Sequence, residues 1–282
     1  MMQHPGGELW KRVAVAAVGI PLAVSQAYLG GYWLAGFLAF MAGLAAWEFC
    51  YMYRQHGLPA APVVAALLGL AYVLIAAGTS IEGFAVSIAV ITLAVATALM
   101  IMTPPGSRPG VTVMITVCGA AYTGLPLGFA VWLHALGGRG PGWHGAAVLF
   151  LPVAVTWLGD TAAYFCGQAF GRHKLAPVIS PAKTWEGASA GLLATAGGAF
   201  LYVALTQPLV AWTLSLGELL GFGVAVAVAG QLGDLFESRF KRDCGVKDSS
   251  GLLPGHGGML DRLDSLLFVF PVGYAYLRLA GL

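Results

Sequence analysis

The chain has 282 residues, of which 59% are hydrophobic and only 9% are charged, with a formal net charge of +2. Soluble proteins carry roughly 25% charged residues, so this composition excludes an ordinary soluble domain. Apolar runs of about 20 residues recur along the chain, whereas the alternating ten-residue segments of a membrane β-barrel are absent. We therefore expect an all-α fold, that of a polytopic helical membrane protein.

Nine membrane spans are predicted, separated by glycine, proline and charged residues. They cover residues of about 12–30, 31–53, 60–78, 82–102, 111–137, 145–166, 186–206, 212–236 and 263–281. We expect residues 1–140 to be N-terminal membrane helices that act mainly as scaffold and face lipid. We expect residues 141–282 to form the catalytic transmembrane region, with cytoplasmic loops at 167–185 and 237–262. Lys11 and Arg12 before the first apolar run would also suit a signal peptide, but the spans that follow at once favour an uncleaved helix.

The basic residues are divided unequally between the two sides of this nine-span arrangement. Twelve of the 14 Lys and Arg residues fall on the side of the N-terminus, and only Arg139 and Arg278 fall on the other side. The positive-inside rule then places the N-terminus and both long polar loops in the cytoplasm. The C-terminus is predicted to lie on the opposite side.

The first two polar clusters lie in the second half of the chain. In WLGDTAAYFCG, Asp160 interrupts an apolar span, at a cost of roughly 2.5–3.5 kcal/mol if it lies at the bilayer centre, so we expect it to face a cavity, an ion or a basic partner. The alternative is a helix-end residue that reaches the headgroups. In GRHKLAPVISPAKTWEG, prolines predict an irregular loop in which Ser180 and Lys183 could donate to phosphate oxygens. This loop could equally be a topology signal or a lipid-headgroup contact.

Gly187 and Gly191 form a GxxxG face that predicts close helix packing.

The third cluster runs from QLGDLFESRFKRD through a PGHGG turn to Asp264. On a continuing helix, one face would hold Asp234, Glu237, Ser238 and Lys241. Asp261 and Asp264, three residues apart, are expected to open the last span and share a face. The helix dipole alone would favour acids in a first turn, but aspartates on two helix ends suit magnesium better, since it takes oxygen ligands. The first five spans contain Glu48 as their only embedded acid, and little else there suggests chemistry.

Residues 238–264, SRFKRDCGVKDSSGLLPGHGGMLDRLD, closely resemble the signature of phosphatidate cytidylyltransferases, also called CDP-diacylglycerol synthases. The segments WLGDTAAYFCG, SPAKTWEG and QLGDLFESRFKR resemble that family's other shared blocks. The last block shows no departure from the pattern. Upstream, Gln168 stands where a basic residue is expected and Ala182 where the family often has a polar one, so we assign neither a substrate role.

The resemblance implies that CTP and phosphatidate, a membrane lipid, give CDP-diacylglycerol and pyrophosphate in a magnesium-dependent step of phospholipid biosynthesis, in a bacterial inner membrane. The predicted catalytic residues are Asp234, Lys241, Arg242, Asp248, Asp261, Arg262 and Asp264. The predicted substrate contacts are Ser180, Lys183, Ser238, Lys241, Arg242, Lys247, His256, Gly257 and Gly258. The predicted metal ligands are Asp234, Asp261 and Asp264, with Asp160 as a second metal or cation contact. No nucleic-acid partner is expected, and a second cation and a homodimer stay open.

Three other interpretations remain. Another lipid or isoprenoid nucleotidyltransferase or kinase would use the same chemistry on a different acceptor. A secondary transporter for an anionic substrate would use Asp160 and discontinuous helices near the midplane of the membrane. Because the polar clusters are confined to one half of the chain and one side of the membrane, transport is the less favoured reading. A structural scaffold would leave the acidic cluster unexplained.

Overall fold

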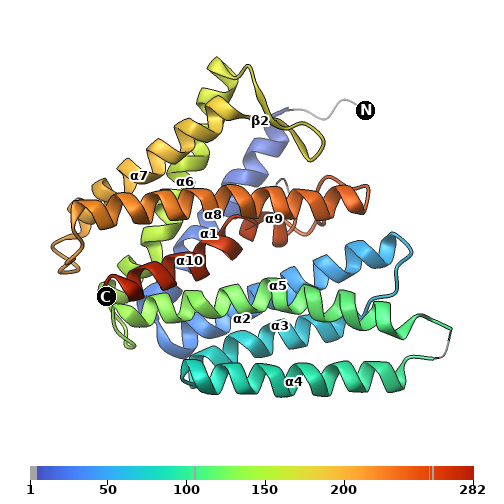
Figure 1. Ribbon diagram of the computed structural model, residues 1–282. Coiled ribbons are helices and arrows are strands. Elements are labelled where there is room, and N and C mark those ends of the chain that lie inside the picture. Colours follow the sequence, from blue (N-terminus) through green and yellow to red (C-terminus); the bar gives the residue numbers. More distant parts are fainter. Residues whose placement is uncertain (1–4, 105, 254, 256) are drawn as a thin grey trace. The chain divides into compact units, whose positions relative to one another are not determined.

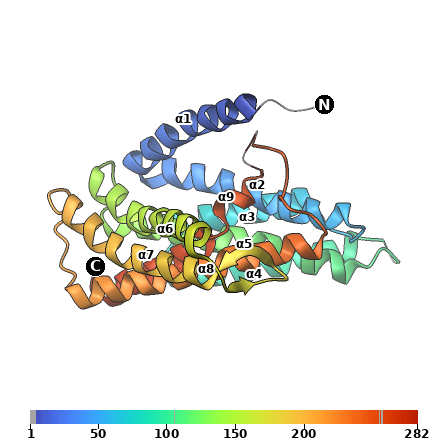
Figure 2. The ribbon, with the colours of Figure 1, turned by 90° about the horizontal axis from the view of Figure 1, so that it is seen from above.

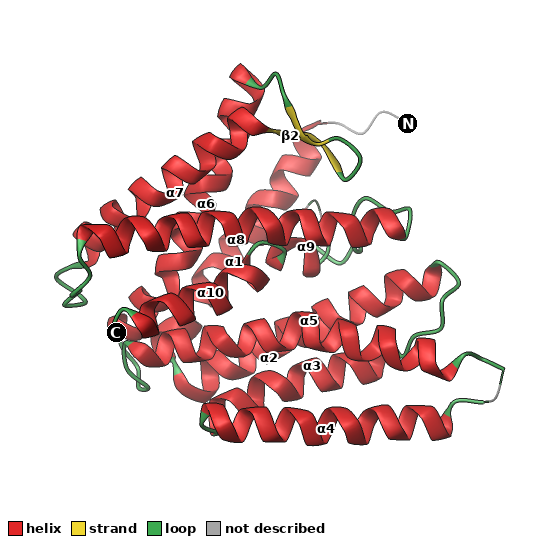
Figure 3. Ribbon diagram, in the orientation of Figure 1, coloured by secondary structure: helices red, strands yellow, loops and turns green. Residues whose placement is uncertain are grey.

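A computed structural model describes residues 5–104, 106–253, 255 and 257–282, with the backbone alone for residues 5–9, 11 and 12, and shows a mainly helical chain (Figures 1 and 3). The helices are α1 (Pro5–Leu29), α2 (Gly31–Gln55), α3 (Pro62–Gly78), α4 (Ile81–Met102), α5 (Pro109–Leu136), α6 (Trp143–Phe170), α7 (Trp185–Thr206), α8 (Leu216–Asp243), α9 (Leu260–Leu263) and α10 (Leu266–Leu279). The strands are β1 (Lys174–Ala176) and β2 (Ser180–Thr184).

Each of the nine apolar segments forms helix, and six of the described helices are long and apolar enough to cross a membrane. These six are α2, α4, α5, α6, α7 and α8. Two shorter apolar helices, Val13–Leu29 and Pro62–Gly78, fall below that length. The helical membrane class is therefore confirmed, whereas a count of nine spans stays a prediction.

The segment between the sixth and seventh spans is not the expected irregular loop. Helix α6 continues to Phe170, and β1 then pairs with β2 in an antiparallel hairpin, with Lys174 opposite Thr184 and Ala176 opposite Ser180. The prolines do not prevent this pairing, because a two-stranded sheet has only edge strands, where a proline without an N–H group is tolerated.

The last span also differs from the continuous helix expected over 263–281. Helix α9 ends at Leu263, Asp264 and Ser265 form a turn, and α10 begins at Leu266. The Asp264 carboxylate accepts a hydrogen bond from Ser265 N at 2.6 Å, which is the local bonding by which aspartate competes with helix. Contrary to the prediction from the sequence, Asp261 and Asp264 therefore do not share a face of one helix.

The chain divides into two compact units. The first contains Met1–Val131 and Asp243–Leu263, and the second contains Trp132–Arg242 and Asp264–Leu282. Within the first unit, α2, α3, α4 and α5 lie side by side (Figure 1). Its core includes Leu68 and Tyr72 of α3 and Ala120 of α5.

In the second unit, α6 and α7 pack together along much of their length (Figures 1 and 2). A Cβ atom on Gly187 would lie 2.7 Å from Ala163 O, and one on Gly191 would lie 3.0 Å from Gly159 O. Only glycine permits such a close approach of two helices. The predicted packing role of this GxxxG face is confirmed.

Candidate active site

The C-terminal half of α8 carries a polar face at the end of an apolar helix. Ser238 Oγ donates to Asp234 Oδ1 at 3.2 Å, and Lys241 Nζ lies 2.5 Å from Glu237 Oε2. The Glu237 side chain is fully buried. Since both pairs are four residues apart on one helix, the predicted shared face is present.

The β1–β2 hairpin adds a second basic residue to this face. Lys183, on β2, places its Nζ 2.5 Å from Asp234 Oδ2, and both side chains are partly exposed. Arg242 Nε donates to Ile179 O at 3.4 Å, so a second contact joins the hairpin to α8. Thr184 ends β2 and also caps α7, since its hydroxyl accepts from Gly187 N at 3.1 Å. The hairpin is thus held at both ends, and Lys183 is presented to Asp234.

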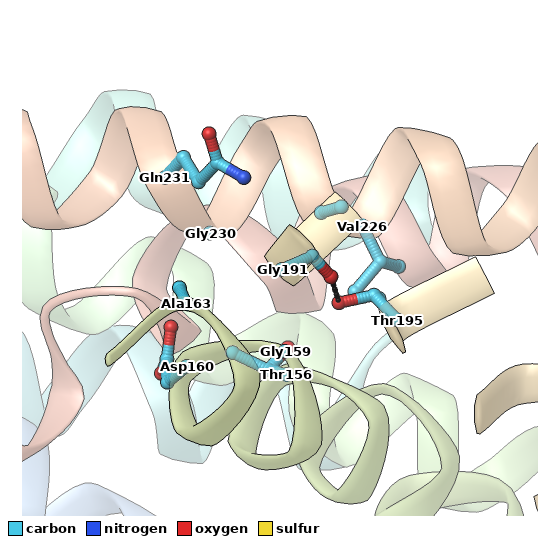
Figure 4. A pocket seen from close by; sticks show the side chains of 10 residues that line it. Thr156, Gly159, Asp160, Ala163, Gly191, Thr195, Val226, Gly230 and Gln231 are labelled. Atoms are coloured by element: carbon cyan, nitrogen blue, oxygen red, sulfur yellow. Dashed lines mark hydrogen bonds between the residues drawn. The ribbon is translucent and has the colours of Figure 1, made fainter. Parts of the chain in front are cut away.

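Asp160 lies in a small pocket formed within the second unit by α6, α7 and α8 (Figure 4). Thr156, Thr195 and Gln231 supply further polar atoms to its lining. The cavity volume is about 20 Å³, which is enough for one water molecule or a small ion. Thr195 Oγ1 donates to Gly191 O at 2.9 Å, so its lone pairs are available to an occupant.

Three carboxylates of the second unit influence one another. Burial of Asp264, which lies between α9 and α10, raises the pKa of its carboxyl to about 6, with the negative charges of Asp234 and Asp160 adding to the effect. Lys241 opposes that rise. The pKa is raised because burial, first, and the neighbouring negative charges, second, both disfavour the ionised form of Asp264.

This donor set has the chemistry that magnesium prefers, because all three side chains offer carboxylate oxygens. A bound cation would favour the ionised form of Asp264, which burial and the charges of Asp234 and Asp160 disfavour. Among the described residues, however, no three His, Cys, Asp or Glu side chains are arranged to hold a metal ion. The ligand type therefore fits magnesium, while a closed site of three carboxylates is not formed in this conformation.

The remaining predicted ligand, Asp261, belongs to the first unit and is almost fully buried. It lies in α9, within the segment of residues 244–263 that follows α8, which we call the signature loop. Its Oδ2 atom accepts hydrogen bonds from Ser249 N at 2.9 Å, Ser249 Oγ at 2.8 Å and Gly258 N at 2.7 Å. Gly257 has φ +77°, a conformation that favours glycine, and Leu253 N donates to Gly257 O at 2.8 Å. One oxygen of Asp261 is thus committed to closing the loop.

Three other predicted site residues of this loop are exposed, namely Lys247, Asp248 and Arg262, whereas Gly257 is half-buried and Gly258 is buried. Arg242, in the second unit, is also exposed. His256 lies outside the described residues. Asp243 accepts a hydrogen bond from Tyr53 Oη at 3.3 Å, which ties the start of the loop to α2.

The sequence matches the profile of the cytidylyltransferase family over residues 10–280. The chain belongs to this family. A Haemophilus influenzae protein named phosphatidate cytidylyltransferase is 43% identical over 129 residues, 46% of this chain and 45% of that protein. A Thermotoga maritima protein of the same name is 45% identical over 136 residues, 48% of this chain and 50% of that one. These two matches span about half the length of the relatives.

A third relative, from Pseudomonas aeruginosa and again named phosphatidate cytidylyltransferase, is 35% identical over 288 residues, which cover 97% of this chain and 98% of that protein. The resemblance seen in four short motifs therefore extends across nearly the whole chain. The N-terminal helices, which contain none of those motifs, are part of the shared sequence.

The structure of this cytidylyltransferase-family protein groups Lys183, Asp234, Ser238 and Lys241 closely within one unit. The sequence identifies Glu48 as an embedded acid but assigns it no role; in the structure it is fully buried in α2 and bonds to the signature loop within the first unit. One signal was available, because an acid inside an apolar span requires polar partners. The sequence could not identify those partners, which lie about 200 residues away.

Proposed function

We propose that this protein transfers a cytidylyl group from CTP to phosphatidate, giving CDP-diacylglycerol and pyrophosphate for phospholipid synthesis. The family membership and the full-length match to the Pseudomonas aeruginosa relative support the reaction. The structural observation that carries the proposal is the Lys183–Asp234 pair, beside Ser238, at the polar end of an apolar helix. Such a place suits a lipid phosphate and a nucleotide phosphate that must meet at a membrane surface.

In this reaction a phosphate oxygen of phosphatidate attacks the α-phosphorus of CTP. The bond from that phosphorus to the bridging oxygen of the β-phosphate breaks, and pyrophosphate leaves. The attacking phosphate is already ionised at neutral pH, so no general base is required. The protein must instead bring two anions together and stabilise the charge of the transferred group.

Lys183, Lys241 and Arg242 are the proposed phosphate ligands of the second unit. Lys183 and Lys241 are each paired with a carboxylate, Asp234 and Glu237, so their ammonium groups are held in place before substrate binds. Preorganised cations lower the cost of ordering the site when the phosphates arrive. Ser180 and Ser238 supply hydroxyl groups on the same elements.

We propose magnesium as the cofactor, held by Asp234 and Asp264, with Asp160 as the contact for it or for a second cation. When bound, the ion would neutralise charge on the nucleotide phosphates. Support comes from the carboxylate chemistry of these three side chains and from the position of Asp264, whose pKa is raised by burial first and then by the charges of Asp234 and Asp160. Asp261 stays a predicted ligand, with one oxygen already used within the signature loop.

We further propose that the N-terminus and the polar loops face the cytoplasm of a bacterial cell and that the chain crosses its inner membrane, with the C-terminus opposite. The uneven distribution of Lys and Arg supports this orientation. It also places the site where soluble CTP can reach it.

An acceptor panel tests the proposed substrate. The purified full-length protein is incubated with labelled CTP and, in separate reactions, phosphatidate, diacylglycerol or an isoprenoid phosphate, and the lipid product is identified by mass spectrometry. We expect CDP-diacylglycerol from phosphatidate alone. A nucleotidylated isoprenoid, or phosphorylation of diacylglycerol, would refute the proposed acceptor in favour of a related transferase.

A further inference from the structure

Glu48 connects an N-terminal helix to the signature loop, although it lies outside every motif of the proposed site. Its side chain is fully buried in α2. Glu48 Oε1 accepts from Ser250 Oγ at 2.7 Å and from Met259 N at 2.9 Å. Glu48 Oε2 accepts from Leu260 N at 2.8 Å and lies 3.1 Å from Ser249 Oγ. All these residues belong to the first unit.

These contacts resemble a helix cap supplied by another helix. Leu260 is the first residue of α9 and Met259 precedes it, so neither N–H has an acceptor within that helix. An ionised carboxylate only accepts, through two oxygens with about four lone-pair positions. Each oxygen of Glu48 therefore takes one backbone N–H and faces one serine hydroxyl.

The same loop is closed from the other side by Asp261. Ser249 Oγ lies 2.8 Å from Asp261 Oδ2 as well as near Glu48, so a single hydroxyl hydrogen is shared between two carboxylates. Gly258 lies against both carboxylates, since its N–H donates to Asp261 Oδ2 at 2.7 Å and a Cβ atom on it would be 2.5 Å from Glu48 Oε2. The position of Gly258 thus depends on the position of the Glu48 carboxylate.

We propose that Glu48 is a positioning residue, which holds Ser249, Ser250 and residues 258–260 of the signature loop in place and so sets the position of Asp261 for the transfer reaction. The proposal rests on the proposed function. A direct contact with substrate is not part of it, because the side chain is fully buried and its oxygens are taken up by the loop. Through this carboxylate, helix α2 positions part of the signature loop, which goes beyond the scaffold role expected for the N-terminal helices.

Glu48→Gln keeps the size and shape of the side chain but removes its charge and replaces one acceptor oxygen with a donor NH2 group. The amide NH2 must replace one oxygen, and on either side it meets a backbone N–H that cannot reverse its role. The hydroxyl of Ser250 or Ser249 can rotate and accept, but Met259 or Leu260 loses its acceptor. Since an unsatisfied buried donor is costly, we expect local opening of the loop and a fall of about tenfold or more in kcat.

The test uses full-length protein in lipid nanodiscs and two measurements. Hydrogen–deuterium exchange over residues 247–264 reports the loop directly and does not require activity. Steady-state kinetics with CTP and phosphatidate, normalised to folded protein, report its consequence. Glu82→Gln is the matched control, because this acid also lies in the first unit but is exposed, and its carboxylate accepts only a long hydrogen bond of 3.4 Å from Ser80 Oγ.

We expect Glu48→Gln to exchange faster in residues 247–264 and to lower kcat, with Glu82→Gln unchanged in both. Normal exchange in that segment, or normal kcat per folded molecule with a lower melting temperature, would overturn the proposal and leave Glu48 a purely structural residue. If Glu48→Gln does not fold, Ser250→Ala removes one donor to Oε1, and unchanged exchange in that variant would equally overturn it. A wild-type protein without transferase activity would refute the proposed function, while the exchange measurement would still test the loop contact.

Discussion

Gly258→Ala is the substitution to which the signature loop should respond most strongly. The added Cβ atom would lie 2.5 Å from Glu48 Oε2 and 2.7 Å from Glu48 Oε1, and it would collide with Ser249 Oγ. Ordinary contact requires about 1 Å more separation from the carboxylate. Because Gly258 N also donates to Asp261 Oδ2 at 2.7 Å, the glycine cannot retreat without breaking that hydrogen bond.

The expected cost of Gly258→Ala is estimated from the groups that must move to make room for the added Cβ atom. Overpacking a buried position costs about 1–3 kcal/mol, and a hydrogen bond to a charged group contributes about 1.5–3 kcal/mol. Displacing Glu48 weakens its bonds from Met259 N and Leu260 N, now 2.9 and 2.8 Å long. We therefore expect a cost of roughly 2–4 kcal/mol for closing the loop, which corresponds to a fall in kcat/KM of about 30-fold to 800-fold.

The assay measures CDP-lipid formation from labelled CTP, together with thermal unfolding in the same detergent. Gly251→Ala is the matched control, since it lies in the same loop, is exposed and has nothing within 4 Å of the added Cβ. That variant should stay within about 0.5 kcal/mol of wild type. Equal activity of the Gly258 and Gly251 variants would refute the close packing of Gly258 against Glu48.

Three further substitutions test separate contacts. Asp261→Asn should lower turnover by about a hundredfold or more while the protein stays folded, because the amide oxygen still accepts hydrogen bonds from the loop but the negative charge is lost. An active, folded variant would remove Asp261 from the proposed metal ligands. Lys183→Gln should lower the free energy of unfolding by less than about 1 kcal/mol, since the ion pair of Lys183 with Asp234 is partly exposed. It should nevertheless lower kcat/KM by about tenfold, and kinetics equal to wild type would contradict the proposed binding of phosphate by Lys183. Thr184→Ala should lower stability by about 1 kcal/mol through loss of the cap on Gly187 N, and an unchanged melting temperature would contradict this.

Apolar length predicted the helices of this fold well, because membrane helices satisfy their backbone hydrogen bonds internally and depend little on distant partners. Prediction was wrong at two local breaks. Asp264 bonds to the next backbone N–H and separates α9 from α10, and residues 174–184 form a hairpin in spite of two prolines. Both depend on a choice between local bonding patterns that hydropathy does not register.

The candidate site was predictable in its residue types and only partly in its connections. The spacing on α8 correctly placed Asp234, Ser238 and Lys241 together, since a helix has a fixed periodicity. The bonds of Glu48 with Ser249, Ser250, Met259 and Leu260 were not predictable, because they join segments about 200 residues apart. Tertiary contacts of that kind leave no periodic signal in a single sequence.

The most direct test of the central claim is the transfer reaction itself. Purified full-length protein is incubated with phosphatidate and CTP labelled at the α-phosphate, with magnesium present or removed by a chelator, and both the lipid product and pyrophosphate are quantified. We predict CDP-diacylglycerol and pyrophosphate in equal amounts, formed only with magnesium. Folded protein that binds CTP or phosphatidate yet forms neither product in magnesium would contradict the account and favour a transport role for the same anion-binding residues.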